Sequence, residues 1–452
     1  MKGLIYPLAA RLATLVVFCM AVTVHSAAPT SPTLPDQSPD KTLGVVNCSS
    51  SLCHGSVTPW QSSPVAQNEY VVWSRLDKHA RAYNVLLNER SRSIASKLGL
   101  SKPAHESKEC LDCHTHNPTA ERTDARHKIT DGVGCEGCHG PSGQWIASHT
   151  APDANHAANL QHGLYPSDDP QARANLCMSC HFGNTSKYVN HRTMAAGHPR
   201  LSFELETFTN LQPAHFKPDA DYTKRKGSGA TNSAKVWALG QAIAVSTQMD
   251  ILVDPQRGRD GVFPEPTLFD CHACHHPMAD QRWKPRTAFG TSIAPGLIRL
   301  NDANALMLRL ILRQLDAEQY GRFTLAAQEL NKALAGNGKL NDKAQALRQQ
   351  AQAAAQKIGT SNFDGNTLRA MALILIDDGL AGLYPDYSGA EQATMALGSL
   401  SSAMQQTGTI KNPAAYNKGL AQLRAVLVKD EAYKPAEFAA RLREFRTLVA
   451  AR

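Results

Sequence analysis

The chain has 452 residues, enough for two domains of ordinary size, and a formal charge of +8. A modest basic excess of this kind is compatible with a nucleic-acid partner. The N-terminus, however, predicts a secreted protein, and a secreted protein rarely meets nucleic acid, so we exclude that class of partner.

The first 26 residues have the pattern of a secretory signal peptide. Lys2 and Arg11 precede an apolar run from Leu12 to Val24, and small residues suited to cleavage follow it. The run has 13 residues, fewer than the roughly 20 that span a bilayer, so a cleaved signal is favoured over an uncleaved anchor. No later segment is expected to be long and apolar enough to span a membrane, and the predicted location is the periplasm. Residues 27–40, rich in proline and small polar residues, predict a flexible leader.

Ten cysteines remain once Cys19 leaves with the signal peptide, and they fall into five pairs, each followed directly by a histidine. The groups are Cys48/Cys53 with His54, Cys110/Cys113 with His114, Cys135/Cys138 with His139, Cys177/Cys180 with His181, and Cys271/Cys274 with His275. Four of them read Cys-x-x-Cys-His, the pattern of covalent haem c attachment. In this chemistry the two thiols bind the porphyrin and the histidine is the proximal iron ligand.

Three other uses of cysteine pairs explain the pattern less well. Zinc sites do not need a histidine directly after each pair. Redox-active pairs of the thioredoxin kind would not occur five times in one chain. Structural disulfides suit a secreted protein but leave all five histidines without a role.

The first group, CSSSLCH at residues 48–54, has four residues between its cysteines instead of two. If it bound no haem, two free thiols in an oxidising compartment and the adjacent His54 would have no function. We therefore interpret it as a working variant in which the additional residues bulge outward, because the serines between the cysteines are small. The sequence thus predicts five covalently bound haem c groups.

The second axial ligands are expected among twelve further histidines, all of which lie in the part of the chain with the motifs. No histidine and no cysteine occurs after His276. This enrichment beside the motifs favours distal ligation by histidine. Met194 or Met278 is the alternative, and an axial methionine would raise the potential of its haem.

Sequence similarity to a known family extends beyond the cysteine motifs themselves. It is carried by four stretches: WSRLDKHARAY, CLDCHTHN, DGVGCEGCHGPSGQWIASH and CMSCHFGNTSKYVNHRTMAAGHPR. They resemble the multihaem cytochrome c family that includes the tetrahaem cytochrome c-554 of nitrifiers. The resemblance implies that histidines in the KHA context and shortly after CHGP are distal ligands. By this resemblance the distal candidates are His79, His149, His191 and His198, with His105 as the fifth choice and His215 in reserve. The chain departs from the family in its fifth motif, its widened first motif and its long haem-free C-terminal part.

The predicted fold is mainly α. Residues 41–285 are expected to form a pentahaem domain of short helices and loops, with an exposed loop at 223–232 and a helix at 234–252. Residues 286–452 predict a haem-free helical bundle, because apolar residues recur there at helical spacing. One stripe holds Leu308, Ile311, Leu312 and Leu315, and another holds Phe438, Leu442, Phe445 and Val449. A chain ending near Pro285 would retain every cysteine and every candidate ligand.

The sequence predicts an electron carrier, because closely spaced haems let single electrons hop along the protein. The partners would be redox proteins of the periplasm or cell surface. The competing hypothesis is a multihaem oxidoreductase acting on a small nitrogen or sulfur compound at one haem with an open axial position. All five motifs end in His, which weighs against the pentahaem nitrite reductases that use Lys in one motif. A third possibility is a cytochrome that polymerises into a conducting filament, and the sequence leaves the oligomeric state open.

Overall fold

The computed structural model describes residues 32–63, 65–216, 232–261, 263–276, 286–294, 296–297, 299–336 and 338–451. The predicted signal peptide, most of the loop at 223–232 and Met278 lie outside these residues. The described residues form helices connected by loops, with two small antiparallel hairpins, so the prediction of a mainly α fold is confirmed.

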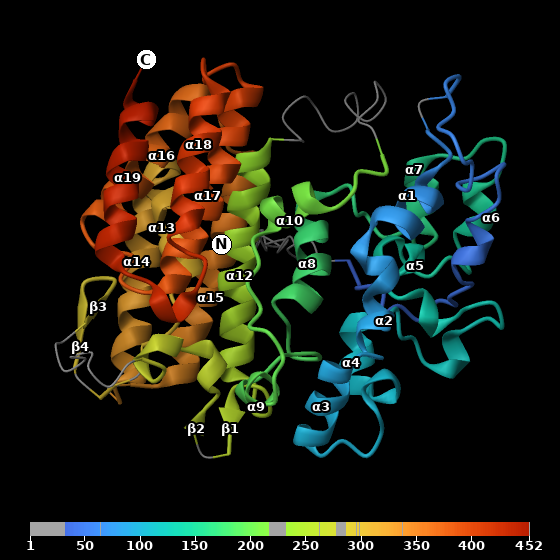
Figure 1. The fold of residues 1–452 in the computed structure, drawn as a ribbon, viewed down its shortest axis with the longest axis horizontal. Coiled ribbons are helices and arrows are strands. Elements are labelled where there is room, and N and C mark those ends of the chain that lie inside the picture. The colour runs from blue at the N-terminus through green and yellow to red at the C-terminus, as the bar shows by residue number, and fades with distance from the viewer. Residues whose placement is uncertain are drawn as a thin grey trace, which may run out of the picture. The chain divides into compact units, whose positions relative to one another are not determined.

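The part of the chain that carries the first four motifs consists of short helices, coloured blue to green in Figure 1. They are α1 (Glu69–Leu76), α2 (Ala82–Val85), α3 (Glu89–Leu98), α4 (Lys108–His114), α5 (Cys135–His139), α6 (Ile146–His149), α7 (His156–Gln161), α8 (Pro170–His181), α9 (His191–Ala195) and α10 (Leu205–Leu211). The sequence sets their ends: Asp169 accepts hydrogen bonds from the first backbone amides of α8, and Pro170 occupies its first position. Gly99 ends α3 in the left-handed conformation, at φ 69°.

Longer helices make up the rest of the structure. They are α12 (Ser233–Val253), α13 (Ala303–Leu315), α14 (Ala317–Leu334), α15 (Leu340–Thr360), α16 (Gly365–Leu380), α17 (Tyr387–Gln406), α18 (Pro413–Ala425) and α19 (Pro435–Ala450). Between α12 and α13 lie the hairpins β1 (Arg259–Asp260) with β2 (Phe263–Pro264) and β3 (Arg286–Ala288) with β4 (Thr291–Ile293). In the second hairpin Thr287 pairs with Ser292.

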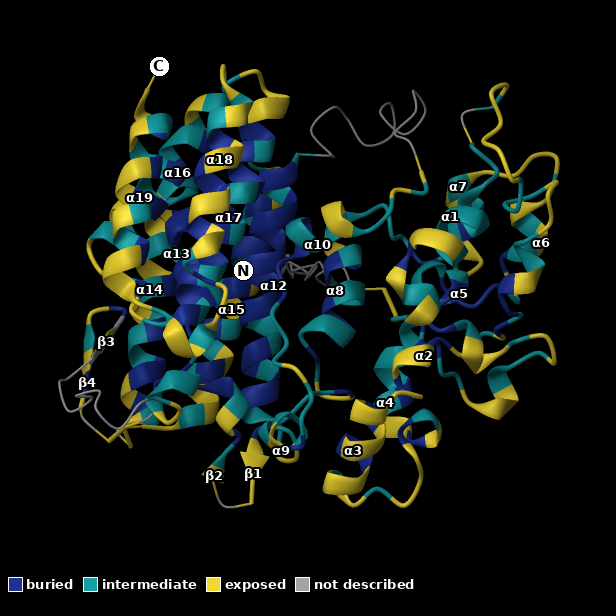
Figure 2. Ribbon diagram, in the orientation of Figure 1, coloured by how far each residue is buried: buried dark blue, intermediate teal, exposed yellow. Residues whose placement is uncertain are grey.

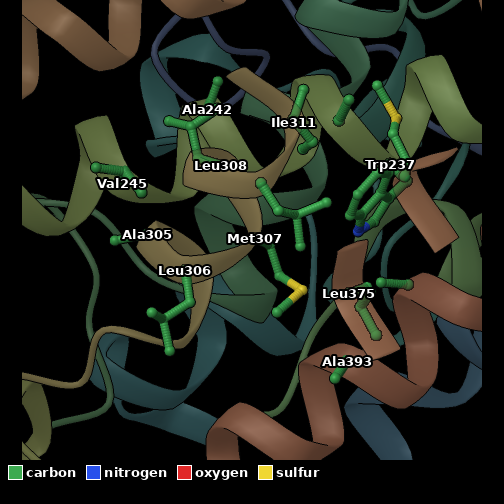
Figure 3. Packing of buried hydrophobic residues seen from close by; sticks show 14 of the residues in the cluster. Trp237, Ala242, Val245, Ala305, Leu306, Met307, Leu308, Ile311, Leu375 and Ala393 are labelled. Atoms are coloured by element: carbon green, nitrogen blue, oxygen red, sulfur yellow. The ribbon is translucent and has the colours of Figure 1, made fainter. Parts of the chain in front are cut away.

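One large apolar core lies among these longer helices (Figure 3). The predicted stripe of α13 is central to it, because Leu308, Ile311 and Leu312 are fully buried. The predicted stripe of α19 is buried in the same core. Figure 2 shows the buried residues gathered in this bundle, whereas the short helices α1 to α9 are mostly of intermediate or high exposure.

Helix α12 bears on two sequence-based predictions, the lack of a later membrane span and the domain boundary at residue 285. By length and composition it could cross a membrane, which corrects the statement that no segment after the signal peptide is long and apolar enough. Yet 78% of its apolar window is buried within the structure, as expected for a core helix that is apolar all round. Its residues share the large core with α13, α15 and α17, all of which lie beyond the predicted boundary at residue 285. That boundary stays a prediction, but the core of the bundle extends across it.

The opposite face of α12 packs against α8 and α10. Val236, Ile243 and Ala244 of α12 form a second small core with Ala174 and Met178 of α8. Because α8 ends in the fourth motif, α12 links the bundle directly to a predicted haem site.

Candidate haem sites

Three of the five cysteine motifs are helical, and this geometry suits haem attachment. The motif residues at the ends of α4, α5 and α8 follow a spacing of i, i+3 and i+4. In a helix these positions lie on one face, so both thiols and the proximal imidazole point to the same side. The fifth motif begins in a short 3-10 helix, Cys271–Ala273, that Asp270 caps at the His272 amide.

The widened first motif closes into a compact loop. The His54 amide donates to the Cys48 carbonyl at 3.2 Å, which brings the histidine back beside the first cysteine despite the two additional residues. Leu52 is 78% exposed, so the additional residues do bulge outward. A Cβ at Gly55 would lie 1.9 Å from the Ser49 carbonyl oxygen, so this loop requires glycine there.

Two of the predicted attachment cysteines, Cys53 and Cys274, depart from the helical arrangement of the second, third and fourth motifs. Cys53 lies in the turn of the widened loop, where its amide donates to the Ser50 carbonyl at 2.9 Å. Cys274 follows the end of the 3-10 helix and is exposed, whereas the other nine motif cysteines are only partly exposed. Because neither residue has the helical register that aligns thiols with an imidazole, the structure supports these two attachment points least, and their role stays a prediction.

All ten motif cysteines are free thiols in the described part of the chain, and none is paired in a disulfide. Each of the five pairs therefore keeps both of the sulfurs that covalent attachment of one haem would use.

In the described residues, each of the five predicted proximal imidazoles lies opposite one other imidazole. The five pairs, with the distance between ring centroids, are His54–His149 at 6.0 Å, His114–His198 at 6.4 Å, His139–His215 at 6.3 Å, His181–His79 at 5.9 Å and His275–His191 at 6.1 Å. A metal–imidazole bond is about 2.0–2.1 Å long, and the ring centre lies roughly 1.1 Å beyond the nitrogen. Two imidazoles on one iron therefore have centroids about 6.3 Å apart, and each pair leaves room for a single iron.

Hydrogen bonds at Nδ1 orient several of these rings. Nδ1 of His54 lies 2.9 Å from Oε2 of Glu69, and Nδ1 of His79 lies 2.9 Å from Oδ1 of Asp77. The corresponding partners of other rings are the carbonyl of Ala82 for His114, the hydroxyl of Ser167 for His139 and the carbonyl of Pro199 for His198. A carboxylate or carbonyl oxygen can only accept, so at Nδ1 it fixes the tautomer and leaves Nε2 as the nitrogen that binds a metal; the Ser167 hydroxyl could serve either role.

Electrostatics also favours neutral rings at two sites. Burial, helped by neighbouring histidines, lowers the pKa of His139 and that of His181 to about 4. A metal ligand must be neutral imidazole, so this environment suits ligation. At His79 the hydrogen bond to Asp77 raises the pKa of the ring against the opposing effect of burial. Although burial alone would raise the pKa of Asp77, the hydrogen bonds from His79 lower it to about 2, so its carboxylate remains ionised.

The predicted distal candidates differ in where the structure places them. His79, His149, His191 and His198 each lie opposite a proximal histidine. His105, the fifth choice, lies opposite none in the described residues: its ring is beside Tyr83, with centroids 6.5 Å apart, and Nε2 is 3.6 Å from Glu106.

His215, the reserve, occupies the place opposite His139. The two residues are 76 positions apart in the chain, and no local motif in the sequence connects them. The pair His116 and His127 is also close, at 5.8 Å, but neither residue follows a cysteine pair and Nε2 of His116 is hydrogen-bonded to Thr42.

Cysteines of different motifs also meet. The thiols of Cys48 and Cys135 lie close enough to influence each other electrostatically, and so do those of Cys113 and Cys180. Cys138 interacts electrostatically with Cys177 and with Cys180. Haem groups attached through these sulfurs would have adjoining edges at the first and third motifs, and likewise at the second and fourth. Over the described ranges, no three His, Cys, Asp or Glu side chains form a group able to hold a metal ion on their own.

The comparison with protein families gives one result. The family model described as cytochrome c554 and c-prime matches residues 47–140. This stretch contains the first three motifs, including the widened one, and excludes those at Cys177 and Cys271. No curated protein and no solved structure matches the chain.

Proposed function

Residues 47–140 place the chain in the c554-type family of cytochromes, which carry covalently bound haem c, and from this premise we propose that it is a pentahaem electron-transfer protein. The observation that carries the proposal is the set of five imidazole pairs with centroids 5.9–6.4 Å apart. Each pair provides one proximal and one distal ligand for a single iron. When bound, haem supplies one-electron redox chemistry.

The distal ligands in this proposal are His79, His149, His191, His198 and His215. His215 replaces His105 of the sequence-based set, because only His215 lies across from a proximal ring. With an imidazole on both sides of every iron, no axial position is left for a substrate. This arrangement favours electron transfer over the oxidoreductase alternative, which needs an iron with an open position.

The contacts between motifs support a route for the electrons. The first and third sites adjoin through Cys48 and Cys135, and the second and fourth adjoin through Cys113 and Cys180. Cys138 connects the third site to the fourth. The fifth site adjoins the second, because their distal ligands lie seven residues apart, at positions 191 and 198. The proposed order is therefore first, third, fourth, second and fifth, with the first and fifth haems at the two ends.

The proposed partners are redox proteins of the periplasm or cell surface, one at each end of this route. The basis for the compartment is the signal-peptide pattern of residues 1–26. The route itself requires no substrate pocket, only exposed haem edges where partners dock. The exposure of Cys274 in the fifth motif agrees with a terminal haem whose edge a partner can reach.

Mass spectrometry of the mature protein is expected to show five covalently bound haems. In Cys48→Ala the first haem retains one thioether at most, through Cys53, so the variant should lose that haem or hold it loosely, while the other four remain. A wild-type mass with four haems would contradict the interpretation of the widened first motif. Cys19→Ala is the matched control, because this cysteine is expected to leave with the signal peptide.

The reduced wild-type protein is expected to bind no carbon monoxide and to show only low-spin haem in its optical and electron paramagnetic resonance spectra. The reason is that carbon monoxide needs an iron with a free or weakly held axial position, and two imidazoles occupy both positions at every site. Stoichiometric binding to one haem, with turnover of hydroxylamine or nitrite, would support the oxidoreductase instead.

A further inference from the structure

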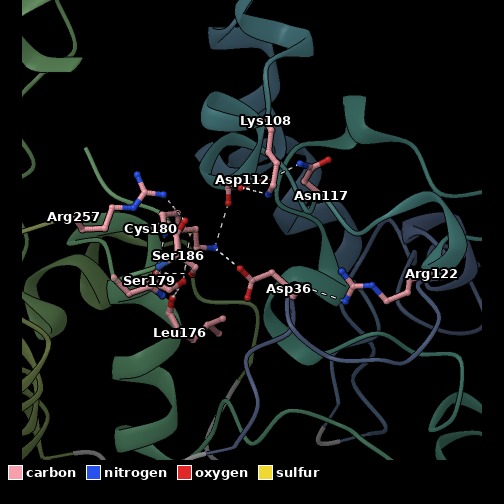
Figure 4. Close-up of polar contacts among 12 residues, drawn as sticks. Asp36, Lys108, Asp112, Asn117, Arg122, Leu176, Ser179, Cys180, Ser186 and Arg257 are labelled. Atoms are coloured by element: carbon pink, nitrogen blue, oxygen red, sulfur yellow. Dashed lines mark hydrogen bonds and ion pairs between the residues drawn. The ribbon is translucent and has the colours of Figure 1, made fainter. Parts of the chain in front are cut away.

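A buried lysine lies where the second and fourth motifs meet. Lys187 is only 8% exposed, and its Nζ is 2.9 Å from Oδ2 of Asp36 and 3.2 Å from the backbone carbonyl of Asp112. Asp112 immediately precedes Cys113 of the second motif. The same ammonium interacts electrostatically with the Cys180 thiol of the fourth motif. Figure 4 shows this network around Cys180, Asp112 and Asp36.

The loop that carries Lys187 is held firmly. Oδ1 of Asn184 accepts hydrogen bonds from the amides of Ser186 and Lys187, at 2.9 and 3.0 Å. The guanidinium of Arg257 donates to the Ser186 carbonyl at 2.9 Å from outside the loop. The position of the ammonium is therefore fixed relative to the sulfurs of both motifs, and burial protects its charge from screening by salt.

We propose that Lys187 sets the reduction potentials of the two haems attached at Cys110/Cys113 and at Cys177/Cys180. The inference rests on the proposed function, because it assumes that both motifs carry haem. A fixed positive charge favours the reduced state of a nearby haem, which carries one positive charge fewer than the oxidised state. Lys187 would thus make the two haems easier to reduce than the same haems without it.

The negative charge of Asp36 weakens the effect of Lys187 on the two reduction potentials but does not cancel it. Asp36 is 29% exposed at its side chain, so water screens its carboxylate more than the buried ammonium. The ammonium interacts electrostatically with the Cys180 thiol, and Asp36 is its counter-ion. By Coulomb's law at an effective dielectric constant of about 20, a unit charge roughly 12 Å from an iron changes its reduction equilibrium about tenfold.

The test is a spectroelectrochemical titration of the intact five-haem protein. In Lys187→Met two of the five potentials are expected to fall, each corresponding to about tenfold weaker reduction, or about 59 mV for a one-electron couple. Lys187→Arg keeps the charge and should restore both potentials, and Asp36→Asn should shift the same two haems in the opposite direction. Lys108→Met is the matched control: this lysine lines one small cavity together with Lys187 and Asp36 but is 79% exposed, so solvent screens its charge.

Haem content measured by mass separates the two proposals. If Lys187→Met retains all five haems and low-spin spectra but its potentials equal those of wild type, the inference about Lys187 is overturned while the proposed function stands. Equal shifts for Lys187→Met and Lys187→Arg would also overturn it, because packing and not charge would be the cause. If the wild-type protein carries no haem at the second or fourth motif, the proposed function itself fails.

Discussion

Replacing His215 by alanine is expected to leave the haem attached at Cys135 and Cys138 with His139 as its only strong ligand. The reason is that the His215 ring is the one opposite His139, with centroids 6.3 Å apart. The reduced variant should bind one carbon monoxide per protein, and one low-spin signal of five should become high-spin. Optical titration with carbon monoxide measures the stoichiometry directly.

His105→Ala is the matched control for this experiment, because the sequence alone ranks His105 above His215. Its ring lies beside Tyr83 and Glu106, so its removal should leave all five haems low-spin and unreactive towards carbon monoxide. A high-spin haem in His105→Ala, with wild-type spectra in His215→Ala, would reverse the proposed ligand assignment.

A chain that ends at Pro285 is expected not to accumulate as a soluble five-haem protein, although it retains every cysteine and every ligand candidate. Such a chain would uncover the large apolar side chains of α12 that belong to the main core: Trp237, Leu239, Val245, Met249, Ile251 and Leu252. Burial of each contributes about 1.5–3 kcal/mol, so together they contribute about 9–18 kcal/mol, which is comparable to the whole stability of an ordinary domain. Soluble yield and haem content of the purified fragment provide the measurement.

In the shortened chain the fifth motif should lose its structure, and its haem, more readily than the other four, because residues beyond the cut hold it in place. The Asp270 amide donates to the Arg299 carbonyl at 2.8 Å, and the Asn301 amide donates to the Leu268 carbonyl at 2.9 Å. A soluble fragment with five haems would show that the haem-bearing part folds without the bundle.

A full-length variant tests the same dependence without a cut. Leu308→Asp, at a fully buried position, should reduce the yield, because it places a carboxylate in the apolar core. Leu325→Asp is the matched control at a position 58% exposed, and it should leave the yield unchanged.

The sequence by itself determined the features that are local in the chain. Covalent attachment needs two thiols and an imidazole within a few residues, so the motifs can be recognised from the sequence alone. Helix formation depends on a repeat of 3.6 residues, which explains why the apolar stripes of α13 and α19 predicted helices. The structure buries residues of both stripes in one apolar core. His79 and His149 could be predicted as distal ligands from the sequence, because short motifs shared with the resembled family surround them.

Only the tertiary structure decided which distant residues meet. The choice of His215 over His105 depends on a contact across 76 residues, and the surrounding sequence carries no sign of it. The place of α12 was likewise undetermined, since a helix that is apolar all round looks the same whether it bridges two haem motifs, crosses a membrane or fills a core. The burial of Lys187 between two motifs has the same origin. In each case the deciding quantity is the set of neighbours in space, which chain folding fixes and local pattern does not encode.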